Sequence, residues 1–138
     1  MMLTMNLQIV GALLVMLGLS HVFFNGYFGW SVELAGVSLF TRRVFFVHTF
    51  FVAMTVTMMG AFSVAHARLL VEPQPLSRAV LAGMTIFWAS RLLMQFTAYE
   101  STIWRGNSFR TRMHVAFSLL WMYVTATYGF ALLESLRG

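Results

Sequence analysis

Long apolar stretches alternate with short polar links along the whole chain. Four such stretches cover residues 4–28, 43–66, 76–99 and 111–134. Each has about 20 residues or more, which at ~1.5 Å per residue lets an α-helix cross a ~30 Å hydrocarbon layer. Short links between spans make neighbouring helices antiparallel. The pattern predicts an all-α, polytopic membrane protein, a four-transmembrane-helix antiparallel bundle in which residues 1–138 form one integral membrane domain.

The composition agrees with this prediction. Hydrophobic residues make up 59% of the chain and charged residues only 9%, whereas a soluble domain carries about 25% charged residues. The lipid bilayer is therefore the expected surrounding. No basic residue precedes the first apolar stretch, and this stretch is longer than the ~7–15 residues of a signal-peptide core. We expect it to be retained as the first span of a multi-pass protein.

The positive charge follows the ends of the predicted spans. The net charge is +5, and every basic residue is an arginine. Apart from Arg91, the arginines flank the spans, as expected for contact with lipid headgroups rather than with nucleic acid, which is excluded as a partner. The side with the first and third links carries more of them, which favours a cytoplasmic location for these links. Its arginines are Arg42, Arg43, Arg105, Arg110 and Arg112, against Arg68, Arg78 and Arg137 on the other side.

Each predicted span also has one polar and aromatic stripe at helical spacing. Residues separated by three, four or seven positions share a helix face, and the small residues of the first stripe permit close helix packing. Four such stripes favour a shared polar interior in one leaflet. The stripes are Gly11, Gly18, His21 and Asn25; His48, Thr55 and Met59; Met84, Trp88, Arg91 and Gln95; and His114, Ser118, Trp121, Thr125 and Tyr128.

Three histidines from different spans are expected near the same side of the membrane. His21 and His48 lie at similar depths, about 9–10 Å inside their helix ends, and His114 lies about 5 Å inside its own. Arg91 and Glu100 approach the same side from the third span. Ionisable groups are costly in lipid, so a group of them marks a candidate functional site.

A metal or haem site is the leading hypothesis. Imidazole is a common ligand of iron, copper and zinc, and helix bundles hold cofactors between side chains of facing helices. His21 and His48 would suit the axial positions of a haem, or His21, His48 and His114 would coordinate a transition metal together with Glu100. The expected role is redox chemistry or electron transfer, as a homo-oligomer or as a subunit of a larger membrane complex.

An organic ligand is an alternative. Arginine offers five N–H donors and a fixed charge, so Arg91 would hold a quinone oxygen or the headgroup of an anionic lipid. Aromatic rings on the same faces would form the walls of such a site. Its candidate residues are Arg91, Gln95, Trp88, Trp121 and Asn25.

Transport of a proton or ion is a further alternative, which a four-helix protomer could perform only as an oligomer. The runner-up to the cofactor hypothesis is a structural or accessory subunit without catalysis. Interhelical hydrogen bonds in membranes average only about 0.6 kcal/mol, whereas a central arginine costs at least ~2.5 kcal/mol. Packing alone therefore explains Arg91 only if Glu100 or a bound anion pairs with it. The chain has no cysteine and no aspartate, which excludes disulfides and thiolate sites and disfavours carboxylate-pair catalysis. No catalytic residue is assigned.

Overall fold

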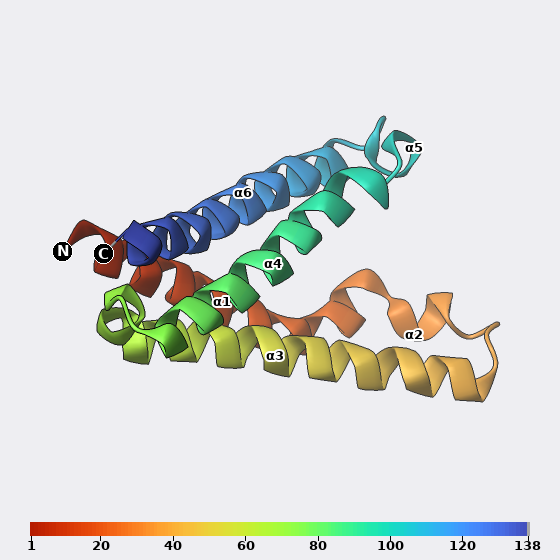
Figure 1. Ribbon diagram of the computed structural model, residues 1–138. Helices are drawn as coiled ribbons and strands as arrows, with labels where there is room; N and C mark the ends of the chain where they lie inside the picture. The colour runs from red at the N-terminus through yellow and green to blue at the C-terminus, as the bar shows by residue number, and fades with distance from the viewer. Residues whose placement is uncertain (138) are drawn as a thin grey trace. The chain divides into compact units, whose positions relative to one another are not determined.

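The computed structural model describes residues 1–137, apart from the side chains at positions 101 and 103. Helices and short connections make up this part of the chain, without a strand (Figure 1). Four helices are long and apolar enough to cross a membrane. The predicted all-α class is thus confirmed, and the helices agree with a four-helix bundle in a multi-pass membrane protein. The elements are α1 (Met2–Phe28), α2 (Trp30–Glu33), α3 (Leu39–Val71), α4 (Pro75–Thr97), α5 (Ser101–Trp104) and α6 (Ser108–Arg137).

Most of the long helices extend beyond the predicted spans. The helix expected from residue 43 begins at Leu39, and that expected from residue 111 begins at Ser108. A hydrogen bond from the backbone N–H of Thr41 to Ser38 Oγ (3.2 Å) caps the first turn of α3. The apolar pattern marks only the part of each helix that lies inside lipid. The helices continue beyond it because no glycine or proline interrupts them at the flanking arginines.

The predicted end of the second span at residue 66 coincides with a break in α3. His66 has φ −118° and ψ 22°, which is outside the helical region, and the helix resumes on the far side as far as Val71. The third long helix, α4, starts where proline predicts. Pro75 occupies the first turn of α4 after Gln74 in an extended conformation, where the missing N–H of proline costs no hydrogen bond.

The chain divides into two compact units, which we call the N-terminal unit (residues 8–65) and the C-terminal unit (residues 1–7 together with the chain from His66 onward). In the N-terminal unit, α1 and α3 approach closely at glycines. A Cβ added to Gly11 would lie 2.7 Å from the carbonyl oxygen of Gly60, and one added to Gly60 would lie 2.6 Å from that of Gly11. Gly18 packs equally closely against Thr57. The close approach predicted for the glycine stripe of the first span is therefore confirmed.

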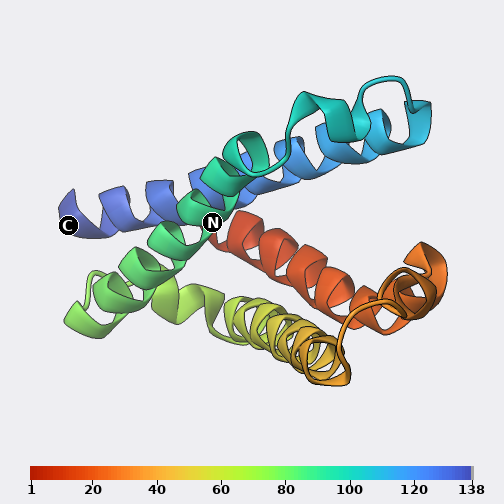
Figure 2. The ribbon, with the colours of Figure 1, turned by 90° about the vertical axis from the view of Figure 1, so that its right-hand side faces the viewer.

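In the C-terminal unit, α4 and α6 lie side by side and run antiparallel (Figures 1 and 2). The short helix α5 packs against α6. The buried side chains recur every three or four residues, as one helix face requires. In α4 they are Ser77, Leu81, Met84, Trp88 and Gln95, and in α6 they include Ser118, Trp121, Val124, Tyr128 and Ala131. The predicted polar stripes of these two spans thus face the packed interior of the unit.

Candidate functional site

Side chains of α4 and α6 form a polar and aromatic cluster that we call the Arg91 cluster, consisting of Trp88, Arg91, Gln95, His114 and Trp121. The three residues of α4 are separated by three and four positions, and the two of α6 by seven, so each set shares one helix face. Trp88 and Trp121 are almost fully buried, whereas Arg91 and His114 are half-buried. The cluster therefore has an enclosed aromatic base and an accessible polar side.

A hydrogen-bonded relay crosses from α4 to α6 in this cluster. Arg91 Nη1 donates to Gln95 Oε1 at 3.2 Å. Gln95 Nε2 in turn donates to His114 Nδ1 at 3.0 Å. The side chain of Gln95 is only 4% exposed, so this buried amide has both of its ends satisfied by protein groups. The relay ties the charge of Arg91 to an imidazole on the neighbouring helix.

Aromatic rings support the guanidinium group of Arg91. Its Cζ atom lies 4.9 Å from the centre of the Trp121 ring and 5.8 Å from that of Tyr99. Trp88 stacks on Trp121 with a centroid distance of 5.2 Å and an interplanar angle of 19°. Such cation–π contacts contribute about 0.5–2 kcal/mol each. The rings thus hold the charge in place and offset part of the cost of its burial.

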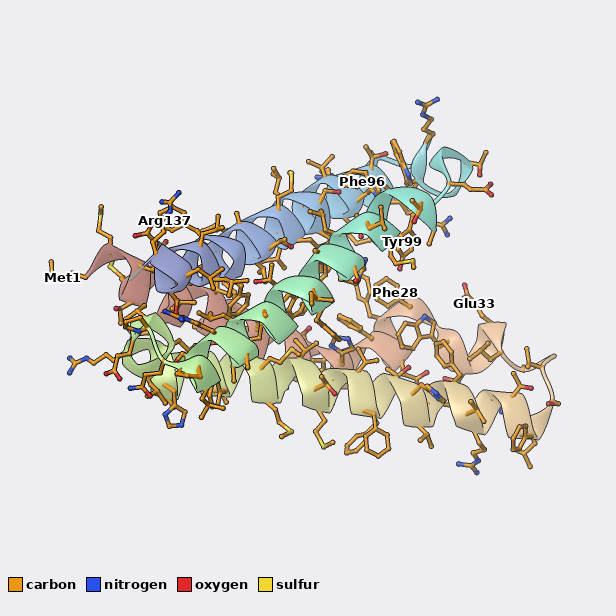
Figure 3. All side chains as sticks on the ribbon, in the orientation of Figure 1. Met1, Phe28, Glu33, Phe96, Tyr99 and Arg137 are labelled. Atoms are coloured by element: carbon orange, nitrogen blue, oxygen red, sulfur yellow. The ribbon has the colours of Figure 1, made fainter. Side chains whose placement is uncertain are left out.

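The imidazole of His114 is also held between aromatic rings. The Trp104 ring of α5 stacks on it at 4.7 Å and 10°, and Phe96 meets it edge-on at 6.2 Å. Figure 3 shows Phe96 and Tyr99 at the end of α4 near α5. Neither Trp104 nor Tyr99 was predicted as a site residue. Trp104 lies in a polar link, where helical periodicity gives no signal. Tyr99 ends the predicted third span four positions after Gln95, and this helical spacing was the signal that could have placed it in the site.

The cluster has more hydrogen-bond donors than acceptors. The indole nitrogens of Trp88 and Trp121, and that of Trp104 on the neighbouring α5, are buried and have no partner within the described residues. Arg91 makes no ion pair in this part of the chain. Glu100, the carboxylate that the purely structural alternative required as a partner of Arg91, is exposed and accepts a hydrogen bond from Thr102. Among the described residues, the charge of Arg91 therefore has no anionic partner, and the three indole N–H groups have no acceptor.

The other two predicted histidines belong to the N-terminal unit, and both bond to their own helix. The Nδ1 atoms of His21 and His48 lie 2.8 and 2.9 Å from the carbonyl oxygens of Leu17 and Val44. A carbonyl oxygen only accepts, so each Nδ1 carries the proton and each Nε2 of the neutral ring has a free lone pair. This is the arrangement in which histidine ligates a metal ion.

Asn25, a predicted ligand-binding residue, also lies in the N-terminal unit, where its Oδ1 accepts a hydrogen bond from Ser31 at 3.0 Å. Among the described residues, no group of three or more His, Asp or Glu side chains is arranged to hold a metal ion. A haem needs only two imidazoles, so this finding does not bear on haem. Ligation by His21, His48, His114 and Glu100 stays a prediction.

Comparison with known proteins gives no match for this chain: no protein family, no curated protein and no solved structure resembles it significantly. The helices define the class, a multi-pass membrane protein.

Proposed function

We propose that this membrane protein binds a lipophilic ligand through hydrogen-bond acceptor oxygens of the ligand, a quinone or an anionic lipid, at the Arg91 cluster. The observation that carries the proposal is the surplus of donors around a cation without a carboxylate partner in the described residues. Arg91 would provide the main contact, since it has one guanidinium N–H bonded to Gln95 and the others available.

The energetics favour a ligand at this position. A cation at the centre of a membrane helix costs about 2.5–3.5 kcal/mol, which is an upper bound for Arg91 because it lies nearer to the end of α4. A buried N–H without an acceptor costs about 1–3 kcal/mol. Cation–π contacts with Trp121 and Tyr99 offset only part of these terms. An acceptor oxygen of a ligand would offset more of them, because charge-assisted hydrogen bonds are about twice as strong as neutral ones.

The depth of Arg91 suits an amphipathic ligand. It lies six positions before the end of α4 at Thr97, which corresponds to about 9 Å along the helix axis. The polar end of the ligand would therefore sit a short distance below the membrane surface. Its apolar part would extend along the exposed faces of the helices, which carry residues such as Leu93 and Met94.

Native mass spectrometry of the protein in nanodiscs tests the proposal, with a quinone and an anionic phospholipid added in separate arms. We expect one of them to bind at a stoichiometry of about one and Arg91→Leu to lose at least about tenfold in affinity, the equivalent of one charge-assisted bond. Arg43→Leu is the matched control, because Arg43 is exposed at the start of α3. Equal binding by the Arg91→Leu variant would contradict the proposal.

We also propose a second candidate, the binding of a haem or a transition metal ion through His21 and His48. Support comes from the bond of each Nδ1 to a backbone carbonyl, which leaves each Nε2 free to act as a ligand. A bound haem, iron, copper or zinc would supply the redox or Lewis-acid chemistry, and the two imidazoles would fix its position. A redox role would suit a homo-oligomer or a subunit of a larger membrane complex.

Optical spectra and metal analysis of the purified protein test this second candidate. A Soret band or stoichiometric metal should disappear when His21 and His48 are replaced by Ala. His66→Ala is the control, since His66 lies at the break in α3 and outside the N-terminal unit. A folded wild-type protein without colour or metal, purified from cells supplied with haem precursor and metal salts, would exclude it.

A further inference from the structure

We propose that Gln95 holds the neutral form of His114 as the tautomer with its proton on Nε2, and that this N–H is a donor of the cluster, in addition to Arg91, for a ligand with an oxoanion group. The ligand class is thus a phosphate or carboxylate rather than a neutral quinone. The ligand part of this inference rests on the proposed function. The tautomer part does not, because it follows from the hydrogen bonds of the protein alone.

The tautomer follows from the direction of each bond in the relay. A guanidinium group has no acceptor, so the Gln95 atom that faces Arg91 must be the carbonyl oxygen. The amide NH₂ then faces His114, and an NH₂ group only donates. His114 Nδ1 must therefore accept, and a neutral imidazole that accepts at Nδ1 carries its proton on Nε2.

The two histidines of the N-terminal unit have the opposite bonding. Their Nδ1 atoms face backbone carbonyl oxygens and must donate. In the neutral state, His21 and His48 therefore have a free lone pair on Nε2, whereas His114 has an N–H there. One chain thus contains histidines of both tautomers, and each kind serves as an internal reference for the other.

This bonding assigns His114 the role of a donor rather than that of a metal ligand. The lone pair on Nδ1 is occupied by Gln95, and Nε2 is protonated, so no ring nitrogen is free to coordinate a cation. Within the described residues, Nε2 forms no hydrogen bond to the protein. The ring is fixed by stacking on Trp104, so its N–H has a defined direction.

The available groups of the cluster favour an anion. Arg91 contributes a full positive charge that no carboxylate balances in the described part of the chain, and His114 contributes an N–H. A quinone carbonyl would accept hydrogen bonds from these donors but would not balance the charge of Arg91. A phosphate or carboxylate group accepts the hydrogen bonds and also balances the charge. Both side chains are half-buried, so a ligand can reach them from the accessible side of the cluster.

Nitrogen-15 NMR of histidine-labelled protein in nanodiscs tests the tautomer without any ligand, at a pH where the rings are neutral. Signals are assigned with single His→Asn variants. We expect the unprotonated nitrogen to be Nδ1 in His114 and Nε2 in His21 and His48. Gln95→Leu should remove the preference at His114, and Gln74→Leu, at an exposed position, should preserve it. If wild-type His114 shows the same tautomer as the other two, the inference is wrong, even if Gln95→Leu does not fold.

Ligand-binding measurements test the second part of the proposal, that the cluster binds a phosphate or carboxylate group. Wild-type protein should bind an anionic phospholipid or inorganic phosphate, and His114→Phe, which keeps a ring against Trp104, should weaken binding by about tenfold. If inorganic phosphate competes with the phospholipid, the ligand is a soluble anion. If it does not compete, the ligand is a lipid headgroup. Binding of a quinone with no anion binding would overturn the inference but keep the proposed function. If neither class binds, the proposed function fails too, while the tautomer result still stands.

Discussion

The guanidinium carbon of Arg91 lies 4.9 Å from the centre of the Trp121 ring. This contact joins Arg91, the one charged residue of the predicted spans that lies away from their ends, to the aromatic core between α4 and α6. Gln95 extends the same charge to His114 through the relay. Arg91 is thus held by neutral partners and has no ion pair in the described chain, and this is the feature on which the proposed ligand site rests.

Replacing Arg91 should have opposite effects on the stability of the protein without ligand and on its ability to bind the ligand. Without ligand, we expect Arg91→Leu to raise the thermal unfolding midpoint in detergent, because the variant no longer places a cation in lipid. The stabilisation that the ligand gives to the wild-type protein should vanish. Arg91→Lys should be intermediate, because lysine keeps the charge but loses the planar fork. A lower midpoint with unchanged ligand stabilisation would instead make Arg91 a structural tie.

Trp121 should matter through its ring and not only through its volume. Trp121→Phe keeps an aromatic face for Arg91 and Trp88, whereas Trp121→Leu removes it. We expect Leu to cost about 0.5–1.5 kcal/mol more than Phe, the size of one cation–π or stacking interaction. Denaturation of both variants in mixed micelles measures the difference. Equal losses would show that only the buried volume counts.

The glycine contact in the N-terminal unit predicts that the stability cost of a Gly→Ala substitution depends strongly on which glycine is replaced. Gly60→Ala would place a methyl group against the backbone of Gly11, and we expect a loss of about 1–3 kcal/mol. Gly83→Ala is the matched control in α4, where a Cβ would meet nothing within 4 Å. It should leave stability equal or up to about 1 kcal/mol higher. Thermal unfolding of the two variants checks the contrast, and equal effects would refute the close approach.

Arg78 should contribute more to stability than Arg137. Arg78 Nε donates to the carbonyl oxygen of Ser135 at 2.9 Å and so satisfies an unpaired group in the last turn of α6. Arg137 forms an exposed ion pair with Glu134, of a kind that contributes about 0–1 kcal/mol. We expect Arg78→Gln to lower the unfolding midpoint and Arg137→Gln to leave it nearly unchanged. The reverse order would contradict the role of Arg78.

Most of the features of the fold that could be predicted from the sequence follow from the periodic apolar spans. The number of spans, the inward faces of α4 and α6, and the start of α4 at Pro75 all follow from residues whose spacing or chemistry acts locally. Helix ends were less predictable, since the arginines that leave the lipid continue the helix. The break at His66 has no sequence signal beyond the loss of apolarity around it.

The hydrogen-bonded relay of Arg91, Gln95 and His114 could not be predicted from the sequence. Periodicity places Gln95 and His114 on inward faces, but the axial register between α4 and α6 decides whether they meet. The stacking of Trp104 on His114 depends on how α5 folds back, which no pattern in a short polar link encodes. The sequence named Arg91, Gln95 and Trp121 as candidates for one site, but it did not predict the contacts between them.

The most direct test of the central claim is the identification, by mass spectrometry, of small molecules that copurify with the wild-type protein, Arg91→Leu and Arg43→Leu. We predict one lipophilic molecule with acceptor oxygens, near stoichiometric in the wild-type and Arg43→Leu proteins and strongly depleted from Arg91→Leu. Equal retention by Arg91→Leu, or equal loss from both variants, would contradict a ligand site built on Arg91.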